Sequence, residues 1–141
     1  MSTTYDADNI FAKILSGAIP SHKVYEDDIA LAFMDVMPQG PGHTLVIPKA
    51  PSRNMLDADA ETLAQLMPRV QKVAMAVKAA YNADGVTVFQ FNETAAGQTV
   101  FHLHFHVVPR FNDVALTGHT GKMEEQDVLK AAAEKIKAAL G

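Results

Sequence analysis

The most constraining feature of this sequence is the strict alternation at residues 101–108, F-H-L-H-F-H-V-V. Successive side chains of a β-strand point to opposite faces of a sheet, so the alternation predicts a strand over 100–108. One face of that strand carries His102, His104 and His106, and the other carries apolar side chains. Three neighbouring imidazoles are costly to bury without partners, so we expect the histidine face to be hydrated or occupied.

The remaining sequence patterns predict an α+β domain around this strand. Breaker residues and apolar periodicity indicate helices at 9–16, 58–81 and 124–140, and further strands at 23–26, 29–35, 43–48 and 86–92. Pro68 lies within the long helical pattern and predicts either a kink or a helix that starts near Met67. We therefore expect one domain over 1–141: a five-stranded, mostly antiparallel sheet with one long central helix, a short N-terminal helix and a C-terminal helix.

Composition narrows the classes of function. The net charge of -4 and the pI of about 5.8 argue against nucleic acid or a membrane surface as the partner. The absence of cysteine excludes a disulfide framework, a thiol nucleophile and a cysteine-based zinc site. The first residues do not resemble a signal peptide, and no apolar run has the length of a membrane helix. We expect a cytoplasmic protein.

Alternating histidines suit two kinds of site. They can offer two or three nitrogens to zinc or copper, or one imidazole can attack phosphorus while its neighbours supply protons. Gly97, Gln98 and Thr99 favour the phosphate site, since glycine lets backbone N–H groups approach an anion and the other two add donors. Carboxylates usually orient metal ligands, and only Glu93 lies nearby. We expect no metal and no cofactor, and a strand-based metal site stays the alternative.

The stretch H-L-H-F-H-V-V resembles the signature of the histidine triad (HIT) family, His-φ-His-φ-His-φ-φ with φ apolar, at all seven positions. The resemblance covers residues 9–110 and includes N-I-F-A-K-I, F-M-D-V and P-G-H-T-L-V-I-P-K. It is greatest to the Hint-like branch, which implies a HIT-like fold, a homodimer, and hydrolysis of purine nucleoside 5′-phosphoramidates to the nucleoside monophosphate. Residues 111–141 form a C-terminal extension beyond the resemblance.

The resemblance assigns roles to four histidines. His104 would be the nucleophile and would form a covalent nucleotidyl-histidine intermediate. His106 would hold the α-phosphate and the leaving group, and His102 would support the imidazole network. His43 matches the family's fourth histidine and would extend that network. Without the resemblance, His43 is more typical of an ordinary strand end.

The resemblance also implies a set of substrate-binding residues. Asp35 would accept hydrogen bonds from the ribose hydroxyls, although a turn-forming aspartate is the other interpretation. The phosphate and leaving group would be surrounded by Asn92, Gly97, Gln98 and Thr99. The base would lie in an apolar pocket formed by Ile10, Phe11, Phe33, Val36 and Leu45. Such a pocket does not read the base edge, so we expect weak discrimination between adenine and guanine. The isolated His22 and His119 are interpreted as surface residues.

Three alternative functions stay open. A dinucleoside polyphosphate hydrolase would use the same triad, and a metal-binding protein or a nucleotide-binding regulatory dimer would belong to other classes. A uridylyltransferase of the galactose-1-phosphate kind is disfavoured, because that branch has glutamine at the position of His106. The acidic charge balance and the lack of cysteines disfavour an aprataxin-like role in DNA repair.

Overall fold

The computed structural model describes residues 5–117 and 122–141, and one antiparallel sheet organises them. Its strands are β1 (Lys23–Glu26), β2 (Ala30–Met34), β3 (Thr44–Pro48), β4 (Gly85–Phe89) and β5 (Phe105–Arg110). They lie in the order β1-β2-β3-β5-β4, and all neighbours are antiparallel. The predicted α+β class with a five-stranded antiparallel sheet is confirmed.

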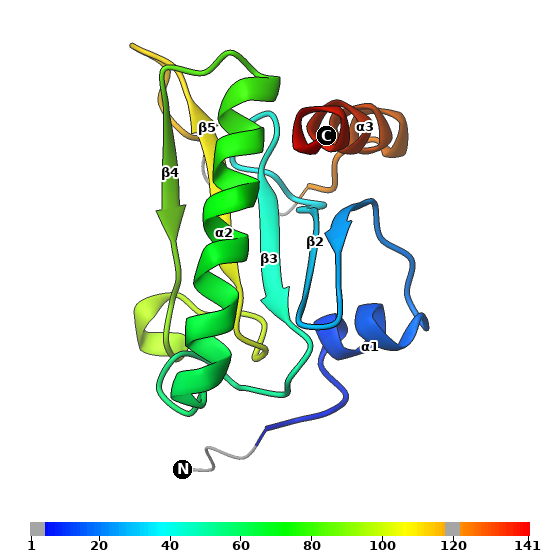
Figure 1. Cartoon of the computed structure of the whole chain (residues 1–141), viewed down its shortest axis with the longest axis vertical. Helices are drawn as coiled ribbons and strands as arrows, with labels where there is room; N and C mark the ends of the chain where they lie inside the picture. The colour runs from blue at the N-terminus through cyan, green and yellow to red at the C-terminus, as the bar shows by residue number, and fades with distance from the viewer. Residues whose placement is uncertain (1–4, 118–121) are drawn as a thin grey trace.

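Helices pack on this sheet at the predicted places: α1 (Ile10–Ser16), α2 (Ala60–Ala80) and α3 (Gln126–Leu140), with a short 3-10 helix η1 (Thr94–Ala96). Figure 1 shows α2 running along the strands, with α3 beside one end of it. Over 5–117 and 122–141, no helix combines the length and the apolarity required to cross a bilayer.

The two faces of the sheet bury two separate clusters. Leu31 and Phe33 of β2 pack with α1, whereas the alternate residues of the same strand pack under α2 and α3. The α2 face also takes in three apolar residues of the triad segment, Leu103, Phe105 and Val107. This part of the alternation therefore behaves as predicted, and it leaves the histidines on the face of α1.

Helix α2 continues through Pro68. A proline removes one backbone hydrogen bond and crowds the preceding turn, which is why the sequence allowed a later start at Met67. Leu66 and Val70 on either side are both buried in the core. Their packing stabilises the helix across the proline, and the alternative start near Met67 is wrong.

The predicted strand at 100–108 is wrong in its first half. β5 begins at Phe105, and of the three histidines only His106 lies in it. The segment before β5 is held differently, because Leu103 N–H donates to the Ser52 carbonyl at 2.8 Å and a His102 ring nitrogen bonds the Pro48 carbonyl at 2.8 Å. A side chain thus takes the carbonyl that a continuing strand would use. The fourth strand likewise ends at Phe89 rather than at residue 92.

Asp27 organises the turn between β1 and β2 and fastens it to α2. Its carboxylate accepts hydrogen bonds from the backbone N–H groups of Ile29 and Ala30 at 2.8 and 2.9 Å. It also accepts from the Tyr25 hydroxyl and from Arg69 Nε, both at 2.6 Å. Partial burial acts to raise the pKa of Asp27, but these hydrogen bonds outweigh it and hold the pKa well below its usual range.

We expect Asp27→Ala to lower the free energy of unfolding by about 2–3 kcal/mol, as for hydrogen bonds to a charged group, measured by urea denaturation at neutral pH. The exposed neighbour Asp28 provides the control, and Asp28→Ala should change the value by less than about 0.5 kcal/mol. A carboxylate with a lowered pKa contributes stability above its unfolded pKa, so the advantage of the wild type should fade below about pH 4. Equal losses in the two variants would contradict this role.

Candidate functional site

His104 has a defined tautomer. Its Nδ1 lies 2.7 Å from the backbone carbonyl oxygen of His102, and a carbonyl oxygen can only accept. Nδ1 therefore carries the proton, and Nε2 keeps a lone pair. The side chain is buried, and burial lowers the pKa of His104 below its ordinary 6.5. A neutral imidazole with an unprotonated Nε2 is a competent nucleophile.

In His106 the proton and the lone pair are on the opposite ring nitrogens from those in His104. The Gln39 backbone N–H donates to Nδ1 of His43 at 3.0 Å, so the proton of a neutral His43 is on Nε2. That Nε2 lies 2.9 Å from His106 Nδ1 and 3.4 Å from Asp35 Oδ2. His106 Nδ1 is therefore an acceptor, and its proton is on Nε2. The two adjacent imidazoles present a lone pair on His104 and an N–H donor on His106.

His102 is a buried support for this arrangement. The Tyr5 hydroxyl lies 2.6 Å from its Nδ1, and the Pro48 carbonyl accepts from its Nε2 at 2.8 Å. Burial lowers the pKa of His102 and keeps the ring neutral. Sequence reasoning missed Tyr5, which precedes the stretch that resembles the HIT family and carries no local signal of its own.

Aromatic side chains enclose the imidazoles. The ring of Phe89 stacks on His106 with centroids 4.3 Å apart and an interplanar angle of 6°. Phe11 of α1 presents its edge to His104 at 4.9 Å. The three histidines are at most 9% exposed, and the expectation of a hydrated or occupied face is wrong for the fully buried His102, whereas His104 and His106 line a cavity. Their burial is tolerated because each ring nitrogen facing the protein has a hydrogen-bond partner.

A cavity of about 530 Å³ opens beside His104 and His106. Asp35 and Thr99 also line it, as the sequence predicts. Its apolar wall contains the five predicted base-pocket residues and seven more: Ile10, Phe11, Phe33, Val36, Leu45, Ile14, Ile19, Pro20, Met34, Met37, Val100 and Met123.

Sequence reasoning missed a polar section of this cavity wall. Ser21, His22 and Gln126 line it, and His22 is therefore more than an isolated surface residue. This section could not be predicted from the sequence, because His22 and Gln126 are 104 residues apart and meet only in the folded chain. His119 lies outside the described residues.

Three predicted phosphate ligands do not line the cavity. Asn92 Oδ1 accepts from the Met55 backbone at 2.9 Å, and Gln98 Oε1 accepts from the Glu93 backbone at 2.8 Å. Gly97 ends η1 with φ of 102°, a left-handed conformation that favours glycine. These residues shape the loop before the triad, and the Asn92 and Gln98 side chains hydrogen-bond to protein groups.

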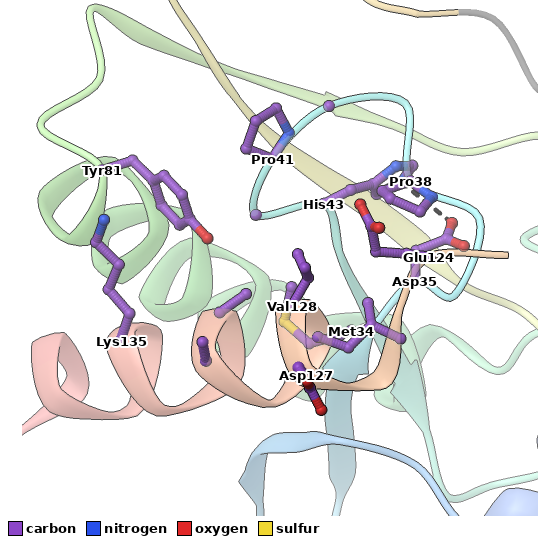
Figure 2. A pocket seen from close by; sticks show the side chains of 15 residues that line it. Met34, Asp35, Pro38, Pro41, His43, Tyr81, Glu124, Asp127, Val128 and Lys135 are labelled. Atoms are coloured by element: carbon purple, nitrogen blue, oxygen red, sulfur yellow. Dashed lines mark ion pairs between the residues drawn. The ribbon is translucent and has the colours of Figure 1, made fainter.

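A second cavity of about 400 Å³ lies between the loop at 38–42, Tyr81 and α3. Figure 2 shows Asp35 and His43 on its border, joined by the 3.4 Å contact between Asp35 Oδ2 and His43 Nε2. Neither His104 nor His106 lines it, so both histidines border only the larger of these two cavities. Asp35 is part of the wall between the two.

A metal ion would find a different ligand set from the one predicted for a strand of histidines. Within the described part of the chain, potential ligand atoms gather at Asp35, His43 and His106, all within 4.8 Å of one another. His102 and His104 are outside this group, and His102 has both ring nitrogens in hydrogen bonds to protein groups. A carboxylate and two imidazoles are ligands that zinc accepts.

Comparison with known proteins connects this geometry to a family. Residues 16–113 match the HIT domain model. A HIT-like protein of Bartonella henselae involved in cell-cycle regulation is 56% identical, with a TM-score of 0.91 over 96% of this chain and 99% of that one. A zinc-bound histidine triad protein of Mycobacterium smegmatis is 36% identical, with a TM-score of 0.83 over 94% and 93%.

One relative has a named activity. The adenylylsulfatase HINT3 of Arabidopsis thaliana is 35% identical over 109 residues, which are 77% of this chain and 55% of that protein. The family model, the two structures and the buried histidines lead to the same conclusion as the sequence signature. This chain belongs to the HIT domain family of nucleotide hydrolases and transferases.

Proposed function

We propose that this protein hydrolyses purine nucleoside 5′-phosphoramidates and related nucleotidyl conjugates through a covalent intermediate on His104. The opposite polarity of two adjacent imidazoles carries the proposal: the lone pair of His104 Nε2 and the N–H of His106 Nε2 border one cavity. Displacement at phosphorus needs a nucleophile together with a donor for the developing negative charge.

The reaction takes two displacements. His104 Nε2 attacks the α-phosphorus while the phosphorus–nitrogen bond breaks, and the amine leaves after taking a proton from water in the cavity. The His106 N–H donates a hydrogen bond to the phosphate or the leaving group throughout. A water molecule then attacks phosphorus, the bond to Nε2 breaks, and the nucleoside monophosphate and one proton are released. His104 returns to its neutral tautomer.

Asp35 and the apolar wall orient the nucleoside in this proposal. One oxygen of Asp35 accepts from the Met37 backbone at 2.8 Å, and this bond fixes the carboxylate at the edge of the cavity. A carboxylate can accept from both ribose hydroxyls. Thr99 contributes a hydroxyl near the histidines, where it would contact the phosphate or the leaving group.

The leaving group is the least constrained part of the substrate. Phosphoramidates, adenylyl sulfate and dinucleoside polyphosphates all present an α-phosphorus to the same nucleophile. The activity in the name of HINT3 supports testing adenylyl sulfate beside the other two.

The cluster of Asp35, His43 and His106 favours one competing function, a metal site. In our proposal the 2.9 Å contact between His43 and His106 is instead a hydrogen bond that sets the tautomer. A metal ion bound to His43 Nε2 would displace the proton on which this tautomer depends.

We also propose that the protein is a homodimer. Strand β4 is the outer strand of the sheet, and it pairs with β5 alone among the described strands. An unpaired strand edge is a template for a second strand, and Val88 in it is 44% exposed. Pairing with a second copy about a two-fold axis would cover this edge.

We expect release of AMP from adenosine 5′-phosphoramidate in the presence of a chelator, faster than from diadenosine triphosphate. His104→Ala should lower the rate about a thousandfold or more, because it removes the nucleophile. Lys130→Ala on the exposed face of α3 is the matched control and should keep the wild-type rate. Turnover that disappears with the chelator, together with stoichiometric bound metal, would support the metal site instead.

Catalytic efficiency should stay level from about pH 8 down to about pH 6.5 and fall below that. Burial lowers the pKa of His104, so the lone pair on Nε2 is lost only at a pH below the ordinary value of 6.5. The measurement is the pH profile of kcat/KM for adenosine 5′-phosphoramidate. An acidic midpoint above 6.5 would contradict a buried neutral nucleophile.

Light scattering coupled to gel filtration should give twice the chain mass of 15.2 kDa. Val88→Lys should favour the monomer, because it places a charge in the proposed interface. Val128→Lys, at a similarly exposed valine on α3, should leave the dimer intact. A wild type with the mass of one chain at micromolar concentration would overturn the dimer.

A further inference from the structure

The C-terminal extension reaches the candidate nucleotide cavity. The backbone N–H of Glu124 donates to the Val36 carbonyl at 2.8 Å, which fastens the start of α3 to the loop after β2. Val36 is itself part of the apolar wall. This hydrogen bond holds Met123 and Gln126 against the cavity. Both residues follow the family motifs in the sequence. The extension therefore completes the cavity wall.

Gln126 is paired with a side chain from the other end of the chain. Its Oε1 lies 2.8 Å from His22 Nε2, and both residues line the cavity. An amide oxygen accepts, so His22 Nε2 is the donor in this contact. The pairing engages one of the two lone pairs of Oε1 and orients the amide, whose NH₂ group carries two donors that can contact a ligand.

Ser21 adds a second polar group to the same section. Its hydroxyl oxygen is buried and has no hydrogen-bond partner among the described residues. A buried hydroxyl without a partner is unfavourable, and a polar ligand edge reached by a change of its χ1 rotamer would satisfy it. Ser21 is adjacent to His22, so both belong to the segment between α1 and β1.

These three residues are the side chains left to recognise the base. Among the described lining residues, the other nitrogen- or oxygen-bearing side chains are Asp35, Thr99, His104 and His106, which the proposed function assigns to the ribose and the phosphate. The rest of the wall is apolar and can contact the faces of a purine without reading its edge. Hydrogen bonds to the base edge must therefore come from the section around Gln126.

We propose that Gln126, oriented by His22 and assisted by Ser21, reads the base and selects a 6-oxopurine over adenine. Guanine presents two acceptors, O6 and N7, whereas adenine presents N7 and the N6 amino donor. A free glutamine amide can bind adenine through N6 and N7, using its oxygen for N6. Here the hydrogen bond from His22 holds that oxygen toward the imidazole, and the NH₂ group of Gln126 is the part left to face the base. The NH₂ group matches the acceptors of guanine and opposes the amino group of adenine. This inference rests on the proposed function.

The test measures equilibrium binding of GMP and AMP by calorimetry. The wild type should bind GMP at least about fivefold more tightly than AMP, the discrimination expected of one well-placed hydrogen-bonding pair. Gln126→Leu should bring the two affinities within about twofold, since it removes the donor but keeps the volume. His22→Ala should release Oε1 and improve AMP binding relative to GMP. A purely structural contact would not improve the binding of either nucleotide.

Lys130→Ala is the control on the same helix and should keep the wild-type preference, with thermal unfolding used to verify that each variant is folded. Equal wild-type affinities, or a preference that survives Gln126→Leu, would overturn the base-reading role while the proposed hydrolase stands. Failure of the wild type to bind either nucleotide would overturn the proposed function and this inference with it.

Discussion

The hydrogen bond from His104 Nδ1 to the His102 carbonyl is the contact on which the site depends. It exists because the chain has not yet joined the sheet at residue 102, so that carbonyl is not engaged in a strand ladder. β5 starts only at Phe105. If regular pairing began at residue 100, the carbonyl would be directed at a neighbouring strand. The irregular start of β5 thus determines which nitrogen of His104 carries the lone pair.

Backbone groups fix both imidazole polarities. The Gln39 N–H sets His43, which sets His106, and the His102 carbonyl sets His104. Because peptide groups do not titrate, they set these assignments for as long as the imidazoles are neutral. A backbone carbonyl rather than a carboxylate sets the tautomer of His104, and Asp35 lines the cavity.

The sequence predicts the fold well where the information is local. Alternation separates Leu103, Phe105 and Val107 from the histidines, and breaker residues delimit most elements. The sequence is a less accurate guide where the end of a strand depends on a contact with a distant segment. Residues 100–104 are an example, because the His102 side chain there bonds the Pro48 carbonyl. The complete burial of His102 was not predicted for a related reason, since its partners Tyr5 and Pro48 come from distant segments.

The residues of the candidate site likewise divide into those that local sequence patterns predict and those that they do not. The triad signature and F-M-D-V locate His104 and Asp35, and the five apolar residues expected at the base line the cavity. Tyr5 and Gln126 could not be found, because their partners lie 97 and 104 residues away. The HIT domain match ends at residue 113, so Gln126 lies outside the part that defines the family. Of the groups proposed to read the base, Gln126 therefore comes from outside the part of the chain that carries the groups proposed to act at phosphorus, whereas Ser21 and His22 lie within it. A change of base preference through Gln126 consequently need not alter the groups proposed to act at phosphorus.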